Sequence, residues 1–176
     1  MTALRDDPLL GIFRAILTFL LGLTIAMGIT LALIIPVVIA NQDRFATELL
    51  PTTSLVPGGD VIGAVLGVVV LVSAIVALTF MLLRHLRRIV DSVRLGDPFV
   101  PENARRLRSM AWLSIALQIV ALIAGGLTMW LEEVSTKFEG NFDISIGGML
   151  FPFVLFVLAR VFKRGAEMRE ELEGTV

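Results

Sequence analysis

Apolar, uncharged residues fill four long stretches of the chain, and the charged residues are confined to the segments between them. A helix that crosses the hydrocarbon core of a bilayer needs about 20 apolar residues, so the first three stretches predict membrane-spanning helices. The fourth stretch is shorter, and we expect Arg160 at its end to reach the headgroups and extend it. The four predicted spans are residues 16–39, 61–83, 110–131 and 144–159.

Amphipathic helices are expected to continue two of these spans. Apolar residues from Leu86 to Val93 recur at the spacing of one helix face beyond the second span. Gly96 suits the position just after a helix end, and Pro101 suits the first turn of a new helix. Apolar residues recur at helical spacing after the fourth span as well. The expected segments are a helical hairpin over residues 84–109 and a tail helix over residues 160–173.

Lys and Arg residues lie mostly on one side of the predicted membrane. The N-terminal tail, the segment between the second and third spans, and the C-terminal tail hold 13 of the 15. Because positive residues favour the cytoplasmic side, we expect a multi-pass protein of the cytoplasmic membrane with both termini in the cytoplasm. That side carries a net charge of +4 and the outer side −5. The total charge of −1 is therefore the sum of a positive cytoplasmic side and a negative outer side.

Together these patterns predict an all-α fold, a single membrane domain over residues 1–176. Its architecture is an integral membrane four-helix bundle with cytoplasmic helical extensions. The outer loop over residues 41–60 shows no clear period. In the other outer loop, β-formers partly alternate over residues 134–146 around Gly140-Asn141, a pattern that favours a small β-hairpin.

Two tryptophans support the placement of the third span. Trp112 and Trp130 are 18 residues apart, or roughly 27 Å along a helix at about 1.5 Å per residue. This separation is close to the thickness of the hydrocarbon core, so each indole can lie at one membrane interface. The alternative is that both are buried packing residues.

Composition excludes several function classes. Hydrophobic residues make up 56% of the chain, above the roughly 45–50% of soluble domains, and the mean hydropathy is +0.88. These values exclude a soluble enzyme domain, a disordered chain and a nucleic-acid-binding domain with a basic face. The chain has no cysteine, a single histidine and no recognised catalytic motif, so we expect no catalytic, cofactor-binding or metal-binding residues. No ionisable residue lies within a predicted span, which argues against an ion-coupled transporter.

Arginines cluster on both arms of the predicted hairpin. Anionic headgroups attract each such charge by about 1 kcal/mol, so contact with lipid explains the cluster, and a docked protein partner is the alternative. The candidate contact residues are Arg84, Arg87, Arg88, Arg105, Arg106 and Arg108.

Small residues recur at four-residue spacing in the spans, as in Thr18, Gly22, Ala26 and Thr30. Such stripes let helices approach closely in a membrane, and they serve either packing inside the bundle or dimerisation. Gln118, deep in the third span, is expected to form an interhelical hydrogen bond, with a substrate contact as the alternative. The candidate packing residues are Gly22, Ala26, Gly63, Gly67, Gln118 and Gly125.

Two segments resemble a known family. The hairpin turn reads GDPFVPENARRLR over residues 96–108, and the chain ends with ARVFKRGAEMREELEGTV over residues 159–176. Together they resemble the prokaryotic membrane proteins known as domain of unknown function 2975. The resemblance implies four spans and no known active site. Because members are often encoded beside a small helix-turn-helix regulator, it also implies a regulatory partner.

The sequence therefore favours a non-enzymatic regulatory or sensing protein that acts through its cytoplasmic face. Its expected partners are the lipid bilayer, a soluble helix-turn-helix regulator and further copies of itself, with no direct contact to nucleic acid and no cofactor. An oligomeric small transporter or channel is the alternative, and an enzyme is the third hypothesis.

Overall fold

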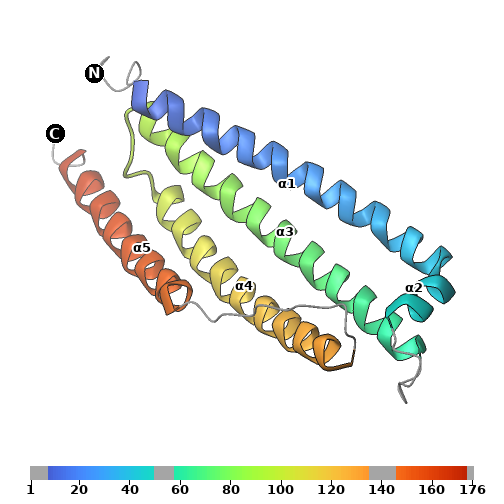
Figure 1. Cartoon of the computed structure of the whole chain (residues 1–176). Coiled ribbons are helices and arrows are strands. Elements are labelled where there is room, and N and C mark those ends of the chain that lie inside the picture. The colour runs from blue at the N-terminus through green and yellow to red at the C-terminus, as the bar shows by residue number, and fades with distance from the viewer. Residues whose placement is uncertain (1–7, 50–57, 135–145, 174–176) are drawn as a thin grey trace.

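The computed structural model describes residues 8–49, 58–134 and 146–173, and every regular element in these ranges is a helix. Four helices are long and one is short, and Figure 1 shows the long ones running alongside one another. The all-α prediction is therefore confirmed for the described ranges. The helices are α1 (Pro8–Ala40), α2 (Gln42–Leu49), α3 (Gly58–Arg94), α4 (Pro101–Val134) and α5 (Ile146–Glu173).

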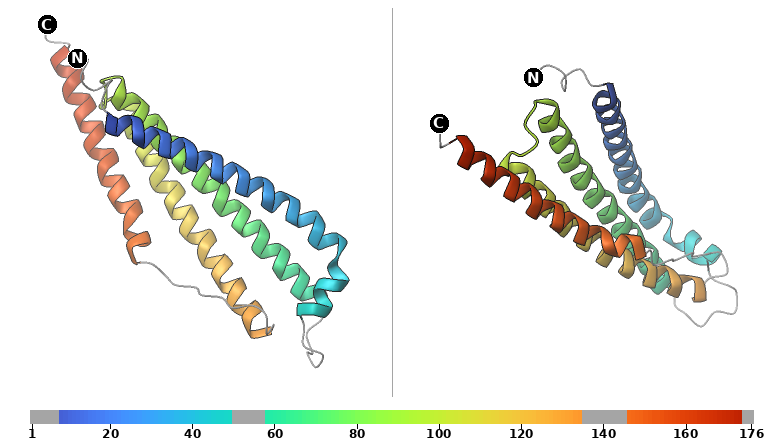
Figure 2. Two further views of the ribbon diagram at one scale, coloured as in Figure 1. Left: turned by 45° about the horizontal axis from the view of Figure 1, so that its top comes forward. Right: turned by 90° about the vertical axis from the view of Figure 1, so that its left-hand side faces the viewer.

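The long helices form an open row in the order α1, α3, α4 and α5. Helix α3 packs on α1 and α4, and α4 packs on α5, whereas α1 contacts neither α4 nor α5 within the described ranges. Figures 1 and 2 show this order from three directions. The predicted bundle is therefore present as a row of helices, and a buried core that includes Ile89, Met110 and Leu155 joins α3, α4 and α5. Lipid can cover the outer faces of membrane helices, so closure is not needed to keep apolar side chains from water.

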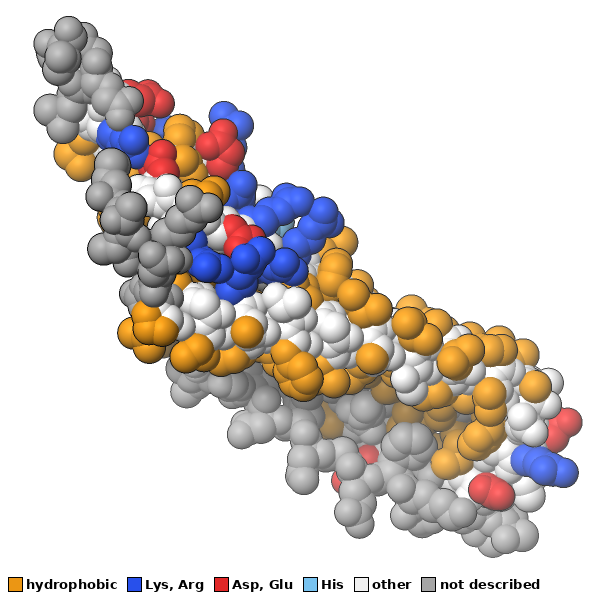
Figure 3. Space-filling view, turned by 90° about the horizontal axis from the view of Figure 1, so that it is seen from above, with side chains coloured by type: hydrophobic (Ala, Val, Ile, Leu, Met, Phe, Trp, Pro, Cys, Tyr) orange, Lys and Arg blue, Asp and Glu red, His pale blue; other side chains and the backbone are white. Residues whose placement is uncertain are grey.

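Three of the helices, α1, α3 and α4, are long and apolar enough to cross a membrane. Many of their apolar side chains face outward, and Phe19 and Leu33 are 71% and 64% exposed. Figure 3 shows hydrophobic surface along much of the visible face, beside a cluster of Lys and Arg. Helix α5 is not among the three: its apolar stretch ends at Arg160, and Lys163 and Arg164 follow within the next turn. The chain is thus a membrane protein, and the fourth span stays a prediction.

Steps of three and four residues define the face of α1 that packs on α3. Leu17, Leu21, Thr24 and Val38 are buried on this face. A repeat averaging 3.5 residues is the spacing of helices that pack with a left-handed coil. The Thr24 hydroxyl donates to the Leu21 carbonyl at 2.9 Å, so this buried polar group has its partner within α1.

The segment between α1 and α3 contains a helix that the sequence pattern did not predict. Helix α2 occupies residues 42–49 of the loop expected over residues 41–60, and α3 begins within that loop at Gly58. Leu49 packs against a buried cluster of Val61, Ala64 and Leu131 that joins α3 to α4. An eight-residue helix is too short to be stable alone, and packing on α3 supplies the missing stabilisation.

The helix ends near the predicted hairpin lie where the sequence placed them. Helix α3 ends at Arg94, α4 begins at Pro101 and α5 continues to Glu173. The predicted β-hairpin falls mainly on residues 135–145, which lie outside the described residues, and its outermost residues Val134 and Ile146 are helical. We call the end of the molecule formed by the starts of α1 and α4 and the ends of α3 and α5 the hairpin end (Figure 1).

Candidate functional site at the hairpin end

The turn after α3 closes the end of that helix. Gly96 has a φ of +85°, a left-handed conformation that glycine adopts without strain. The Gly96 N–H donates to the Val93 carbonyl at 3.0 Å, and the Asp97 N–H donates to the Ser92 carbonyl at 3.2 Å. This pair of bonds is a Schellman motif, so the prediction that Gly96 follows the helix end is confirmed.

Asn103, in the first turn of α4, holds the hairpin together. Its side chain is fully buried, and its Nδ2 donates to Ser92 Oγ at 2.6 Å and to the Pro98 carbonyl at 2.9 Å. Its Oδ1 accepts a hydrogen bond from the Arg106 guanidinium at 2.8 Å. Both N–H groups of the buried amide therefore have acceptors, and one side chain joins α3, the turn and α4.

Arg106 differs from the other arginines of the predicted cluster because it points into the hairpin. Its Nη1 donates to Asn103 Oδ1 and also lies 3.3 Å from the Arg88 carbonyl oxygen. The guanidinium thus bridges α4 to α3 and fixes the buried Asn103 amide. We assign it to the architecture of the hairpin rather than to an exposed contact surface.

Helix α5 docks on this turn through an aromatic contact. The rings of Phe99 and Phe162 have centroids 5.4 Å apart and are tilted by 43°. Phe99 also lies over Gly165, where an added Cβ would be 2.6 Å from Phe99 Cδ1, so glycine permits this close approach. Beside the rings, the Arg169 guanidinium pairs with the Asp97 carboxylate. We call this contact the hairpin–tail junction, formed by Asp97, Phe99, Phe162, Gly165 and Arg169.

Helix α1 reaches the hairpin end through an ion pair. Arg14 Nε lies 3.1 Å from Asp91 Oδ1 of α3, and Arg87 Nε lies 4.0 Å from the other oxygen of the same carboxylate. All four long helices are therefore connected by polar or aromatic contacts at this end.

The arginines predicted as lipid or partner contacts divide into groups. Arg84 and Arg88 are exposed on α3, and Arg87 is partly engaged by Asp91. Arg105 and Arg108 are exposed on α4 beside α5. Figure 3 shows Lys and Arg gathered toward one end of the visible face. These positive groups therefore surround the hairpin instead of forming one compact patch.

The single histidine, His85, lies within this positive region. Burial, and after it the charges of Arg88, Arg106 and Arg84, lower the pKa of His85 below its ordinary value of 6.5. Its Nδ1 is buried and has no hydrogen-bond partner within the described part of the chain. The lowered pKa favours the neutral form of the imidazole within this positive region.

A groove of about 780 Å³ runs between α4 and α5 at the hairpin end. Its apolar lining includes Ala104, Phe156 and Ala159. Trp112 packs edge-on against Phe156, with ring centroids 5.6 Å apart. The charged residues that line the groove are Arg105, Arg108, Arg160, Lys163, Glu167 and Glu170.

Several of the predicted packing residues lie between helices. A Cβ added at Gly67 would be 3.0 Å from Leu127 Cδ2, which places α3 and α4 close together there. The Gln118 amide lies against Gly148 of α5, where an added Cβ would be 2.4 Å from its Nε2. Gly125 is buried in α4. These positions bring α3, α4 and α5 together below the hairpin.

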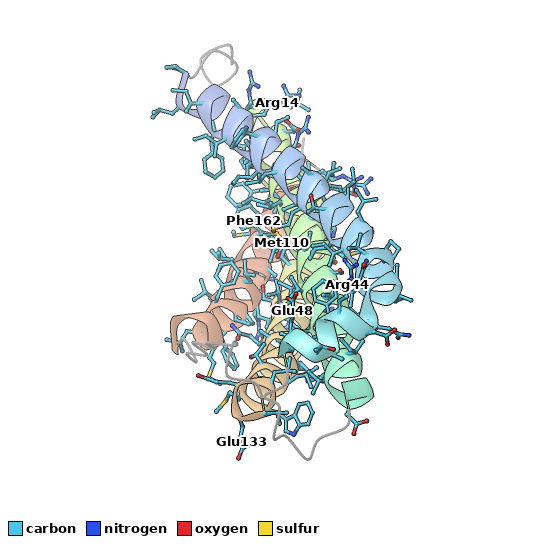
Figure 4. The ribbon with its side chains drawn as sticks, turned by 45° about the vertical axis from the view of Figure 1, so that its right-hand side comes forward. Arg14, Arg44, Glu48, Met110, Glu133 and Phe162 are labelled. Atoms are coloured by element: carbon cyan, nitrogen blue, oxygen red, sulfur yellow. The ribbon has the colours of Figure 1, made fainter. Side chains whose placement is uncertain are left out.

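The small-residue stripe of α1 lies on an exposed face and not on the face that packs on α3. Thr18, Gly22, Ala26 and Thr30 are exposed, and the contact with α3 is made by the larger residues described above. A Cβ added at Gly22, or at the exposed Gly63 of α3, would meet no atom within 4 Å. Within the described residues the stripe is therefore not buried against another helix, and its use in dimerisation stays a prediction. Figure 4 shows the side chains of α1 and its neighbours.

Sequence reasoning considered Phe99 and Phe162 as a joint contact of the hairpin and the tail, but it did not select the other residues of the hairpin–tail junction, Asp97, Gly165 and Arg169. All five junction residues lie in the two segments that resemble the family, so the resemblance was the feature of the sequence that could have indicated them. The pairing itself could not be inferred, because Asp97 and Arg169 are 72 positions apart. Asn103 was missed because a single asparagine near a helix start is common in any helical protein.

Long apolar helices with outward-facing side chains and charged ends define a membrane protein, and one comparison with known proteins assigns the chain to a family. The profile of the family described as protein of unknown function (DUF2975) matches residues 45–176, and the chain belongs to this family. The match begins within α2 and covers α3, α4 and α5, so it contains the hairpin–tail junction and leaves α1 outside. No curated protein and no solved structure matches the chain.

Proposed function

We propose that the protein is a four-span, non-enzymatic protein of a prokaryotic cytoplasmic membrane that regulates or senses through its cytoplasmic face. The hairpin end is this face, because the described segments that form it carry 12 of the 15 Lys and Arg residues. Helix α5 supplies the fourth span, with Arg160 reaching toward the headgroups.

The observation that carries the proposal is the hairpin–tail junction. Its contacts join the α3–α4 turn to the charged half of α5, outside the apolar stretches of these helices. A membrane protein that needed only to span the bilayer would gain little from such a structure. A fixed helical platform is what a soluble partner needs for docking, because a preorganised surface lowers the entropic cost of binding.

Exposed residues around the junction fit a protein partner. Leu95 at the tip of the turn is 82% exposed, and Arg84, Arg88 and Arg105 are exposed on the adjoining helices. Charges of one sign on a rim steer a partner of the opposite sign and suppress wrong ones. We propose a partner with an acidic surface, and the family resemblance favours a small helix-turn-helix regulator encoded nearby.

Co-purification from membranes tests this proposal. The tagged chain is isolated in mild detergent with the adjacent regulator co-expressed, and bound regulator is quantified. The test variant is Arg84→Gln/Arg88→Gln/Arg105→Gln, with Arg106 left unchanged because it holds the turn. We expect at least about a tenfold loss of regulator, corresponding to about 1.4 kcal/mol.

A control variant changes three charged residues of α2 and of the end of α4, which Figure 1 shows away from the hairpin end. The variant Arg44→Gln/Glu132→Gln/Glu133→Gln should retain the regulator at the level of the unmodified chain. Absence of the regulator from the unmodified chain, or equal losses in both variants, would contradict the proposal.

An oligomeric small transporter or channel is the second candidate function, and the open row of helices favours it. Because α1 contacts neither α4 nor α5 in the described ranges, both edges of the row are available to further copies that could complete a pathway. Flux of ions or small solutes into vesicles containing the purified chain decides this candidate. Flux no greater than in protein-free vesicles would reject it.

A further inference from the structure

We propose that the groove between α4 and α5 binds the headgroup of an anionic phospholipid. Arg105, Arg108 and Arg160 contact its phosphate, and the apolar lining around Phe156 contacts the upper part of an acyl chain. The inference rests on the proposed placement of the hairpin end at the membrane surface. It does not depend on a protein partner.

The charges that line the groove are unevenly neutralised. Glu167 lies 3.7 Å from Lys163 Nζ and 3.2 Å from Arg164 Nη1, so its carboxylate is already compensated on α5. By contrast, Arg105, Arg108 and Arg160 form no ion pair or hydrogen bond with any described side chain. These three guanidinium groups outnumber the one other carboxylate of the lining, Glu170. They form a site for a phosphate, which guanidinium binds through paired hydrogen bonds.

The groove lies at the depth of the headgroups. On α4, Arg108 is the last charged residue before Glu132, and on α5 the described residues before Arg160 carry no charge. The two arginines therefore mark the same boundary between polar and apolar surface on adjacent helices. Trp112, one turn beyond Arg108, is 58% exposed, and tryptophan is enriched at this interface.

The combined chemistry favours a lipid over other anions. An acidic peptide or a free phosphate would use the arginines, but neither needs the apolar lining formed by Phe156 and Ala159. The groove volume of about 780 Å³ also exceeds what a single phosphate fills. The phosphate of an anionic phospholipid fits the arginines, and the upper part of its acyl chain fits the apolar lining. Basic pockets between helices at the cytoplasmic boundary are known sites for such lipids.

Quenching of Trp112 fluorescence measures this binding directly. The full-length Trp130→Phe variant leaves Trp112 as the only tryptophan, and it is reconstituted into phosphatidylcholine vesicles. Brominated phosphatidylglycerol or brominated phosphatidylcholine is then added at equal fractions. We expect quenching that indicates about a tenfold preference for the anionic lipid, because the three guanidinium groups attract its headgroup.

Two triple variants in this background separate a specific site from general attraction. Arg105→Gln/Arg108→Gln/Arg160→Gln should abolish the preference. The control removes the same charge on α3, as Arg84→Gln/Arg87→Gln/Arg88→Gln, and should retain it. Arg108→Gln alone should lower the preference, which keeps the test valid if the triple groove variant does not fold by circular dichroism.

Four results would overturn the inference. They are no preference in the parent chain, equal loss in both triple variants, relief of quenching by inorganic phosphate, and relief by a poly-glutamate peptide. The last two would assign the groove to a free anion or an acidic protein segment. Since the regulator is absent, failure here leaves the co-purification result untouched, and failure to bind the regulator leaves the lipid preference intact.

Discussion

Gly165 lies within α5, where replacement of glycine by alanine ordinarily stabilises a helix by about 1 kcal/mol. The hairpin–tail junction reverses this expectation. The new Cβ would be 2.6 Å from Phe99 Cδ1 and 2.9 Å from Cε1, so the ring must leave its place. Phe99 is 41% exposed, and the open side gives the ring room to swing away from Phe162. Gly165→Ala should therefore loosen the docking of α5 on the turn.

The size of the destabilisation by Gly165→Ala follows from the contacts that the Phe99 ring loses. A buried phenylalanine covers roughly 150–250 Å², so a ring with the exposure of Phe99 buries about 100 Å². At about 25 cal/mol per Å² this contact contributes about 2.5 kcal/mol, and the ring pair adds about 0.5–1.5 kcal/mol. With partial loss of both, offset by the gain in helix propensity, the net destabilisation is about 1–2 kcal/mol.

Hydrogen exchange of the purified chain reports this change. Peptides covering residues 160–171 should exchange about 5- to 30-fold faster in Gly165→Ala, because local opening follows the loss of free energy. Gly11→Ala is the matched control, since a Cβ there would meet no atom within 4 Å, and it should slow exchange in α1. In a Phe99→Ala background, Gly165→Ala should become stabilising by about 1 kcal/mol. Slower exchange of α5 in the single variant Gly165→Ala would refute the assigned contact.

Two other residues of the hairpin end give independent tests. Asn103→Ala leaves the Pro98 carbonyl without its donor in a buried site and should lower the local free energy of opening by about 3 kcal/mol, as measured by exchange of the turn amides. As a control, Ser109→Ala at an exposed position should change this local free energy of opening by less than about 0.5 kcal/mol. His85 should titrate below 6.5 by NMR, and Arg88→Gln should raise its pKa. Since the folded state lowers this pKa, the contribution of His85 to stability is complete above pH 6.5 and declines as pH falls through the lowered value; a pKa above 6.5 would contradict the arrangement.

Helix positions were predictable from the sequence because each depended on local chemistry. The turn at Gly96 and the start of α4 at Pro101 follow from backbone conformations that neighbouring residues impose. Helix α2 was not predictable, since eight residues give too short a pattern and its stability comes from packing on α3. The all-helical class was likewise clear from long apolar runs, which permit few other structures in a membrane.

The arrangement of the helices was harder to infer than their positions. A stripe of small residues such as Gly22 and Ala26 marks a surface that allows close approach, but it does not say which surface approaches. In this chain α1 packs on α3 through Leu17 and Leu21 instead. The open row of helices was equally hard to predict. A helix face that is apolar and points outward costs little free energy when lipid covers it, so the sequence does not require the row to close. Burial patterns that close a soluble bundle are therefore absent from the sequence of a membrane protein.

The candidate site was predictable in part. The basic cluster of the hairpin was visible as charge, and the structure separates the inward Arg106 from the exposed Arg105 and Arg108. The junction between Phe99 and Gly165 was not visible, because it depends on the order and tilt of α4 and α5. Such contacts between distant segments require the packing of whole helices, which local patterns do not determine.

Cysteine labelling tests directly whether the hairpin end is the cytoplasmic platform of a membrane protein. The chain contains no cysteine, so each exposed glutamate replaced by cysteine supplies a single reporter. With a membrane-impermeant maleimide, Glu102→Cys and Glu170→Cys should be protected in intact cells and labelled after permeabilisation, whereas Glu48→Cys and Glu133→Cys should be labelled in both. Labelling of positions 102 and 170 in intact cells, or of only one of the two, would contradict the platform.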